Sequence, residues 1–214
     1  NDKLPPRITD TAKTLWFIYV SFTILEAILL SFAGMSIFDA VNHAMSTMAS
    51  GGFSTKNNSL AFWNHLPLVQ YIIILFMFLA GSNFVLSYFA LTGKINKVIK
   101  DDEFKTFLSL VIIFSLTVFI IIYTSVDLNN TYFDNSQIFG KLEGSIRHSF
   151  FQVLAIITTT GFVTADYTAW TPFLTILFFG FMFLGGSAGS TSGGIKVVRH
   201  LLMIKGGILE FKRS

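Results

Sequence analysis

Two short stretches of the sequence combine glycine, phenylalanine and small hydroxyl residues in nearly the same order. The first is TMASGGFSTK, Thr47 to Lys56, and the second is IITTTGFVTA, Ile156 to Ala165. These residue types suit a dehydrated cation, because inward-pointing backbone carbonyls can replace its water. Glycine allows the backbone angles and the close approach that this requires. The pattern predicts cation ligands at the backbone carbonyls of Gly52 and Gly161. Helix capping by the same Gly and Thr residues is the alternative.

A third polar stretch, GGSAGSTSGG, interrupts an apolar segment with five glycines and four Ser or Thr in ten residues. A continuous helix would lose roughly 1 kcal/mol per glycine relative to alanine, which favours a loop. Inside a membrane such a loop must face water or protein, and with little packing it is expected to move. We therefore predict a gate, with a passive kink as the alternative. Its residues are Gly185, Gly186, Ser187, Ala188, Gly189, Ser190, Thr191, Ser192, Gly193 and Gly194.

The same stretch contains G-x-S-x-G at Gly185 to Gly189, the pattern of a hydrolase nucleophile. That pattern has meaning only on a strand-to-helix turn, and no strand pattern precedes it. A phosphate-binding loop is excluded because Ile195 stands where the motif requires Lys. We predict that the chain is not an enzyme and carries no covalent cofactor.

The composition indicates which solvent surrounds these stretches. Of 214 residues, 52% are hydrophobic and only 13% are charged, with 25 phenylalanines and no cysteine. Soluble domains have about 25% charged residues, so the chain is predicted to be an integral membrane protein in contact with lipid. The net charge of +3 comes from basic residues beside apolar runs, which argues against nucleic acid as a partner. The chain begins at Asn1, and we expect it to be a piece of a longer protein.

Three apolar runs can cross a hydrocarbon core of roughly 30 Å as helices. They are Leu15 to Ala33, Leu68 to Leu91 and Thr106 to Ser125. A fourth run, Phe173 to Leu184, stops at the predicted gate and resumes at Ile195, which indicates one broken crossing.

Two further segments, 38–49 and 144–157, are too short to span, and each leads into one Gly-Phe stretch. Short helices that enter and return are tolerated where protein or water covers their backbone, so we predict two pore helices. Basic residues give the orientation, since twelve of 15 flank one side of the spans. Both termini of the chain are thus expected to be cytoplasmic. The twelve residues are Lys3, Arg7, Lys13, Lys94, Lys97, Lys100, Lys105, Lys196, Arg199, Lys205, Lys212 and Arg213.

The order span, pore helix, Gly-Phe loop and span occurs twice, with an offset of 109 residues between Gly52 and Gly161. The predicted repeats are 1–100, with filter loop 50–55, and 101–214, with filter loop 158–163. The second repeat has a longer outer loop, 127–140, which contains the sequon Asn129-Asn130-Thr131. Two repeats of like orientation are related by an axis along the membrane normal, where a pore can run. This recurrence favours the filter over simple capping.

The segments FDAVNHAMSTMASGGFST, FFQVLAIITTTGF and GGSAGSTSGGIKVVR resemble the Trk/Ktr/HKT potassium transporters, most closely the bacterial TrkH type. The resemblance implies an all-α integral membrane protein, of which this chain is repeats two and three of four around a potassium-channel-like pore. It implies uptake of K⁺, with Na⁺ as a further possible ion, through the bacterial plasma membrane. It also implies a homodimer, a cytoplasmic nucleotide-binding ring, a gate loop and an opposing arginine in the fourth repeat. Matching filter residues are Ser50, Gly51, Gly52, Phe53, Thr159, Thr160, Gly161 and Phe162.

Four other polar residues invite a functional interpretation. Glu26 lies inside the first span, where a carboxylate is costly, and could bind an ion, although we favour a structural role. Asn83 is expected to bond across helices. His43 and His148 lack the spacing of metal ligands. A coupled carrier with a midplane cation site and a scaffold without transport remain alternatives to the pore.

Overall fold

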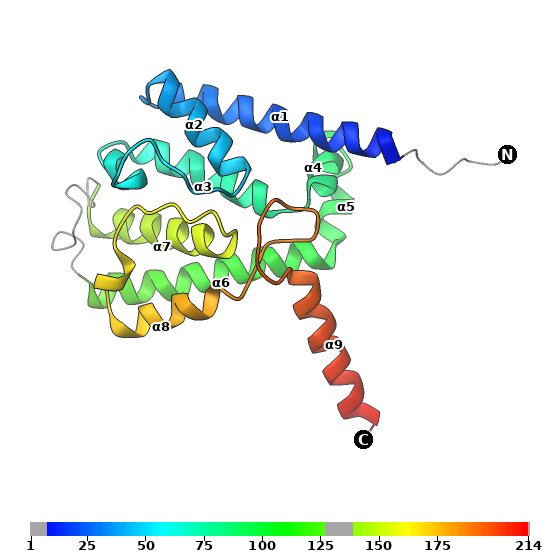
Figure 1. The fold of residues 1–214 in the computed structure, drawn as a ribbon. Coiled ribbons are helices and arrows are strands. Elements are labelled where there is room, and N and C mark those ends of the chain that lie inside the picture. Colours follow the sequence, from blue (N-terminus) through cyan, green and yellow to red (C-terminus); the bar gives the residue numbers. More distant parts are fainter. Residues whose placement is uncertain (1–7, 127–138, 214) are drawn as a thin grey trace.

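The computed structural model describes residues 8–126 and 139–213 (Figure 1). Most of the outer loop of the second repeat, including the sequon at 129–131, lies outside the described residues. The described residues are mostly helical and contain no strand beyond an isolated bridge between Leu184 and Ile195.

The first repeat begins with the long apolar helix α1 (Ile8–Phe32), which packs against the short helix α2 (Ile37–Met48). Ser36 caps α2 because its hydroxyl accepts a hydrogen bond from the backbone N–H of Asp39. A long loop with the short 3₁₀ helix η1 (Ser59–Trp63) then leads into α3 and α4. Helix α2 thus occupies the place where the sequence predicted a pore helix at 38–49.

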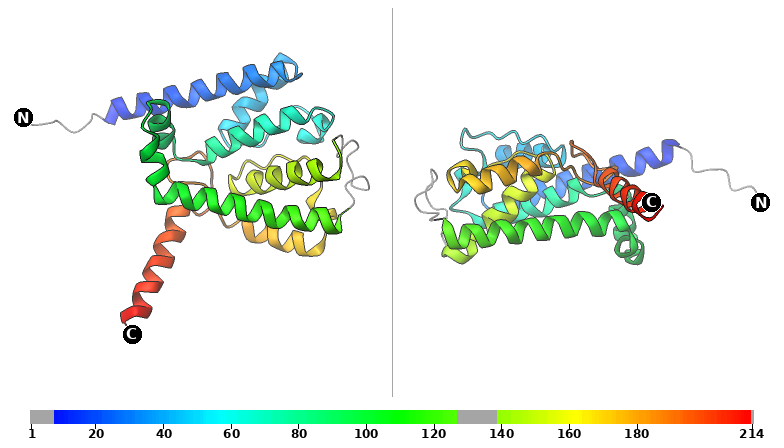
Figure 2. Two further views of the ribbon diagram at one scale, coloured as in Figure 1. Left: turned by 180° about the vertical axis from the view of Figure 1, so that it is seen from behind. Right: turned by 90° about the horizontal axis from the view of Figure 1, so that it is seen from below.

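The second repeat has the same order of elements (Figure 2). The short α5 (Ile95–Lys100) leads into the spanning helix α6 (Asp102–Ser125), which packs along α7 (Lys141–Ile157). Helix α7 covers the predicted pore helix at 144–157. The chain continues through η3 (Tyr167–Ala169), α8 (Pro172–Phe181) and α9 (Val197–Arg213). Helix α9 projects away from the other helices, and the loop that precedes it lies against them (Figures 1 and 2).

The apolar run from Leu68 to Leu91, which the sequence predicted as a span, is not one straight helix. The segment forms α3 (Pro67–Gly81) and α4 (Phe84–Leu91), which are bent by 110° relative to one another. Asn83 causes part of this break, because its side-chain oxygen accepts a hydrogen bond from Val85 N–H and so starts a new helix. Asn83 is therefore a helix cap and not the bond between helices that the sequence suggested.

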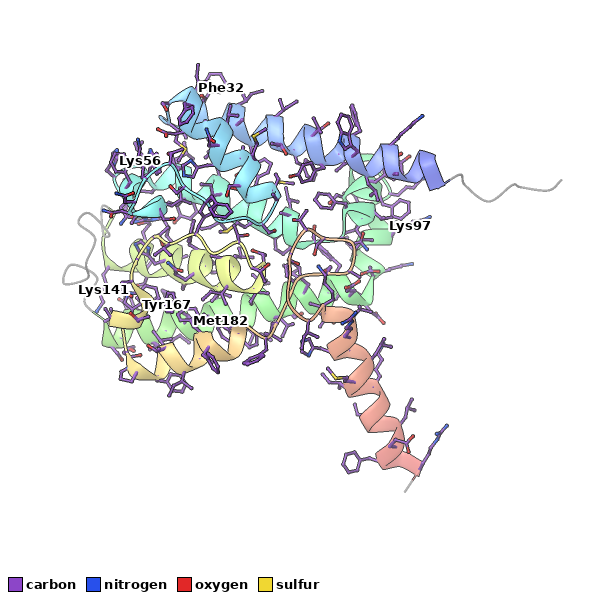
Figure 3. All side chains as sticks on the ribbon, viewed as in Figure 1. Phe32, Lys56, Lys97, Lys141, Tyr167 and Met182 are labelled. Carbon is purple, nitrogen blue, oxygen red and sulfur yellow. The ribbon has the colours of Figure 1, made fainter. Side chains whose placement is uncertain are left out.

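Among the described residues, two helices are long and apolar enough to cross a membrane, α1 over Ala12–Phe32 and α6, and the bent pair α3 and α4 would make a third. Many large apolar side chains on these helices are exposed, as expected for surfaces that face lipid or further protein. Basic residues separate to opposite ends of the structure. Lys56 and Lys141 lie at one end, and Lys97 lies at the other (Figure 3).

Candidate ion filter and gate

The two Gly-Phe loops adopt the same unusual backbone at equivalent positions. Ser50 and Thr159 have φ values of 52° and 56°, and Gly52 and Gly161 have φ values of 68° and 79°. All four lie in the left-handed region, which is costly for residues with a side chain and most of all for β-branched threonine. The two pairs are separated by the same 109 residues as the sequence repeat, so the repeat extends to backbone conformation.

Helix capping explains Ser50 in the first loop but does not explain Gly52. Ser50 follows the end of α2, where Ser50 N–H bonds to Thr47 O at 2.9 Å and Gly51 N–H bonds to Ser46 O at 2.7 Å. This is the Schellman arrangement that ends many helices. Gly52 lies beyond that cap, whereas Gly161 takes part in the second one, because its N–H donates to Ala155 O on α7 at 2.9 Å. The left-handed conformation of Gly52 therefore has a cause other than helix termination.

The two loops lie side by side. A Cβ atom added to Gly52 would overlap the carbonyl oxygen of Thr160, whereas a Cβ added to Gly161 would meet no atom within 4 Å. Hydrogen bonds tie the connections that follow: Ala61 N–H donates to Val163 O at 3.0 Å, and Val163 N–H donates to Ser59 Oγ at 3.2 Å. Gly52 is thus required for close approach between the repeats, and Gly161 borders open space.

Side chains at equivalent positions of the two repeats hold each loop against its own pore helix, but the residue types differ. In the first repeat, Thr55 donates a hydrogen bond to Asp39 at 2.5 Å, and His43 Nε2 lies 2.9 Å from Ser54 Oγ. In the second, His148 Nδ1 lies 2.9 Å from Thr164 Oγ1.

Asp39 is the charged member of this set. The hydrogen bond from Thr55 is the main influence that lowers the pKa of the Asp39 carboxyl, and a bond from Ser36 and the charge of Lys56 assist it. The ionised carboxylate thus holds the outer part of the first loop against α2. The histidines are structural here, and no cluster of metal-ligating side chains occurs among the described residues.

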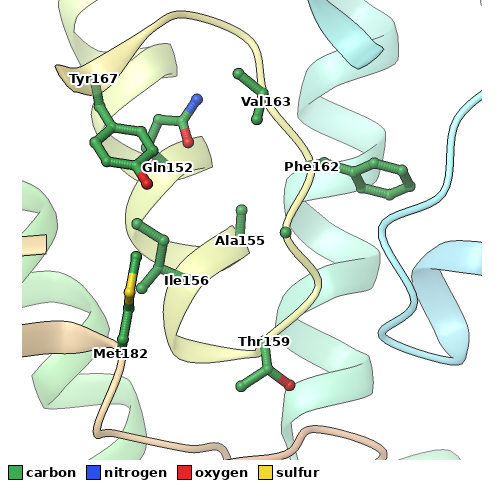
Figure 4. Close-up of a pocket in the computed structure, with 9 residues that line it drawn as sticks. Gln152, Ala155, Ile156, Thr159, Phe162, Val163, Tyr167 and Met182 are labelled. Carbon is green, nitrogen blue, oxygen red and sulfur yellow. The ribbon is translucent and has the colours of Figure 1, made fainter. Parts of the chain in front are cut away.

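The two phenylalanines of the Gly-Phe pairs differ in burial. Phe162 is buried and its ring lies 5.8 Å from that of His43, on the pore helix of the first repeat. Phe53 is 81% exposed. A cavity of about 250 Å³ borders the second loop on the side away from the Phe162 ring (Figure 4). Its lining is largely apolar: Gln152, Ala155, Ile156, Thr159, Gly161, Phe162, Val163, Tyr167 and Met182.

The glycine-rich loop, which we call the gate loop (185–194), is held more firmly than the sequence suggested. Its backbone N–H groups bond to carbonyls that have no helical partner at the break between α3 and α4. Ser187 N–H donates to Gly81 O at 2.9 Å, and Thr191 N–H donates to Ala80 O at 3.2 Å. The Lys196 ammonium donates to the Ser190 hydroxyl at 3.2 Å and also to the Ser192 carbonyl. Hydrogen bonds replace the apolar packing that the loop lacks, which corrects the expectation of a loosely held segment.

The gate loop also contacts both filter loops directly. Thr191 Oγ1 lies 3.0 Å from Ser50 Oγ, and Gly193 N–H donates to Thr159 Oγ1 at 2.6 Å. Ser50 and Thr159 are the left-handed cap residues described above. The structure thus brings together all three polar stretches that the sequence singled out.

A buried cation on α7 was not recognised as structural from the sequence. Arg147 on α7 is fully buried, and its Nε donates to Glu143 at 2.8 Å while a terminal nitrogen donates to Gln70 on α3. Gln70 in turn donates to Asn64 at 2.6 Å, and Asn64 donates to the carbonyl of Thr164 at 3.2 Å. The i,i+4 spacing of Glu143 and Arg147 was the available signal, but the partners on α3 are 77 residues away.

Glu26 is also fully buried, and among the described residues neither of its carboxyl oxygens has a hydrogen-bond partner. The hydroxyl of Thr47 lies beside it, but Thr47 donates its hydrogen to the His43 carbonyl at 2.8 Å.

Comparison with known proteins identifies this arrangement. Residues 1–214 match the family model TrkH, described as a cation transport protein. The chain is 40% identical to the Trk system potassium uptake protein TrkH of Salmonella typhimurium, over 100% of this chain and 42% of that protein. It is 41% identical to the protein of the same name from Escherichia coli, with the same coverage.

The crystal structure of the potassium transporter TrkH from Vibrio parahaemolyticus matches with a TM-score of 0.85 at 34% identity, over 100% of this chain and 44% of that chain. The chain thus spans less than half the length of these relatives. The predicted fold class and family resemblance are confirmed, and the relatives are named as transporters, not enzymes. The chain belongs to the TrkH family of cation transport proteins.

Proposed function

We propose that this chain forms two adjacent quarters of a pore for potassium uptake. The observation that carries the proposal is the pair of left-handed residues that recurs at equivalent positions of both loops, Ser50 and Gly52 in the first and Thr159 and Gly161 in the second. Alternation between left-handed and other conformations turns successive carbonyls toward the same side of the chain. A row of such carbonyls can replace the water around a K⁺ ion. Sodium is a possible second ion of the same site.

The pore helices favour a cation at this place. Helices α2 and α7 both end immediately before a filter loop, at Met48 and Ile157. The C-terminal end of a helix carries a partial negative charge, so both ends attract a cation to the loops. The hydroxyls of Ser50, Thr159 and Thr160 contribute neutral oxygen without a fixed charge. These residues, with Gly51, Phe53 and Phe162 as supports, form the proposed filter.

The gate loop, 185–194, is proposed to obstruct the pore beneath the filter. Its hydrogen bonds to Ser50 and Thr159 support this position, because they hold the loop directly against both filter loops. Opening then requires the loss of these bonds and of those to the α3–α4 break. A held loop with few apolar contacts can exchange one set of hydrogen bonds for another, which suits a segment with two positions.

The rest of the pore and its partners follow from the family. We propose that two further repeats complete the ring in the full-length protein, with an arginine of the last repeat facing the gate. A homodimer, a cytoplasmic nucleotide-binding ring and a bacterial plasma membrane location belong to the same proposal. The excess of Lys and Arg in α5 and α9 supports a cytoplasmic position for these two helices.

One observation favours a second function, a coupled carrier. The break in α3–α4 adds a second discontinuous helix to the one at the gate loop, and paired broken helices are typical of carriers. Ion flux through the full-length protein in proteoliposomes distinguishes the two. A pore gives K⁺ flux far above carrier turnover, and removal of residues 187–192 raises it with unchanged selectivity. A folded deletion variant with unchanged flux would refute the gate, and saturable flux at carrier rates would favour the alternative.

A further inference from the structure

The gate loop is also bonded to helix α6, which belongs neither to the filter nor to the α3–α4 break. The backbone N–H of Ala188 donates to the Oε1 atom of Glu103, at a distance of 2.5 Å. Glu103 lies in the first turn of α6, 85 residues earlier in the chain. Among the described residues this is the one hydrogen bond from a side chain of α6 to the gate loop.

Glu103 is well placed to fix the loop. Asp101 caps α6 by accepting a hydrogen bond from Phe104 N–H at 2.7 Å, so the turn that carries Glu103 is anchored. Helix α6 is one of the two continuous candidate spans, and a long helix is a rigid support. A carboxylate that accepts from a backbone N–H makes a hydrogen bond about twice as strong as a neutral pair.

Charge strengthens this arrangement. The Lys196 ammonium attracts the Glu103 carboxylate, and it also donates to the hydroxyl of Ser190 and the carbonyl of Ser192. The lysine and the glutamate therefore act on the same loop, one by binding its carbonyl and hydroxyl groups and the other by binding its N–H. The loop is therefore held by the hydroxyls of Ser50 and Thr159 and also by Lys196 and Glu103.

We propose that Glu103 is the latch of the gate, a positioning residue that holds the loop in its obstructing position through Ala188. The inference rests on the proposed gate and extends it, because it assigns the stability of the closed position to one carboxylate on the first turn of α6. Any event that draws this turn away from the loop would release the gate without touching the filter.

The test uses three variants of the full-length protein in proteoliposomes. Glu103→Ala removes the acceptor and is expected to raise K⁺ flux about tenfold to a hundredfold, up to the limit set by the loop deletion. Glu103→Gln keeps an acceptor oxygen without the charge, so we expect a rise of only a few-fold. Asp102→Asn is the matched control, since the exposed Asp102 carboxylate pairs with the exposed Lys205 at 3.5 Å and, among the described residues, has no hydrogen bond to the gate loop; its flux should match the unmodified protein. The ratio of K⁺ to Na⁺ flux should stay constant in all three.

Hydrogen exchange gives a second measure that does not depend on transport. The peptide that contains Ala188 is expected to exchange about tenfold to a hundredfold faster in Glu103→Ala and a few-fold faster in Glu103→Gln. If Glu103→Ala does not fold, Glu103→Gln decides alone. Unchanged flux and unchanged exchange in the folded variants would overturn the latch. If the loop deletion still raises flux in that case, the gate stands and only the latch fails; if the deletion also has no effect, the gate itself is wrong.

Discussion

Substitutions at three glycines can test the proposed filter, because the free-energy cost of a left-handed backbone is known for each of them. Gly161 and Gly93 have nearly equal φ values, 79° and 76°, and an added Cβ would meet no atom within 4 Å at either position. An Ala at either site therefore pays only the cost of a left-handed conformation, about 1–2 kcal/mol. Gly93 lies between α4 and α5, away from the filter, which makes Gly93→Ala a matched control for Gly161→Ala.

The expected effect follows from this cost. If the strain in Gly161→Ala is relieved by a turn of the peptide group, its carbonyl leaves the ion and K⁺ loses up to that amount of binding free energy. A change of 1–2 kcal/mol corresponds to about a 5- to 30-fold loss in the ratio of K⁺ to Na⁺ permeability. Gly93→Ala should lower thermal stability to a similar degree and leave the permeability ratio unchanged.

Gly52→Ala should have a larger effect than Gly161→Ala, because its Cβ would overlap the Thr160 carbonyl and displace the second loop as well. The measurement is the reversal potential of the full-length protein in bilayers with K⁺ on one side and Na⁺ on the other, with the melting temperature as the control for folding. The reasoning is refuted if Gly161→Ala and Gly93→Ala have the same permeability ratio. It also fails if Gly52→Ala is as selective as the unmodified protein.

Three further predictions concern charged residues. Because hydrogen bonds from Thr55 and Ser36 lower the pKa of Asp39, the stabilisation is fully present above the usual pKa near 4 and is lost as pH falls through the lower folded value. Acid unfolding of Asp39→Asn in detergent should therefore lack this component, and an unaltered pH profile would contradict it. Arg147→Met leaves Glu143 without its buried partner and should cost about 3–5 kcal/mol of unfolding free energy, measured by denaturant titration; a loss below about 1 kcal/mol would show that the network is not structural. Glu26→Gln should retain both fold and flux, since the buried carboxyl has no hydrogen-bond partner among the described residues to lose; a large loss of flux in a folded protein would indicate an ion ligand instead.

Local chemistry in the sequence predicted the elements and the polar stretches well, for identifiable reasons. Apolar length indicated α1 and α6, and the recurrence of Gly-Phe at a fixed offset indicated two equivalent loops. What failed depended on contacts between distant segments. The break at Gly81 exists because the gate loop, over 100 residues later, bonds to the carbonyls of Ala80 and Gly81. A hydropathy profile contains no trace of such a partner.

In the candidate site, too, local chemistry was predictable and contacts between distant segments were not. The glycines were recognisable because their backbone requirement is a property of the residue itself. The hydroxyls of Ser50 and Thr159 were recognised as oxygen donors, but their contacts with the gate loop were not predictable. Glu103 and Arg147 were not singled out, because their partners, Ala188 in the gate loop and Gln70 on α3, are distant in the sequence.

The contacts between the two repeats also limit the order in which the structure can form during synthesis. Ser50 bonds to Thr191, which is 141 residues later, and Asn64 bonds to Thr164, which is 100 residues later. At about 5–20 residues per second, a ribosome needs roughly 7–28 s to make the segment from Ser50 to Thr191. Until Thr160 and Thr191 have been made, Gly52 and the Ser50 hydroxyl lack the neighbours that they have in the folded chain. The first Gly-Phe loop can therefore complete its contacts only after most of the second repeat has been synthesised.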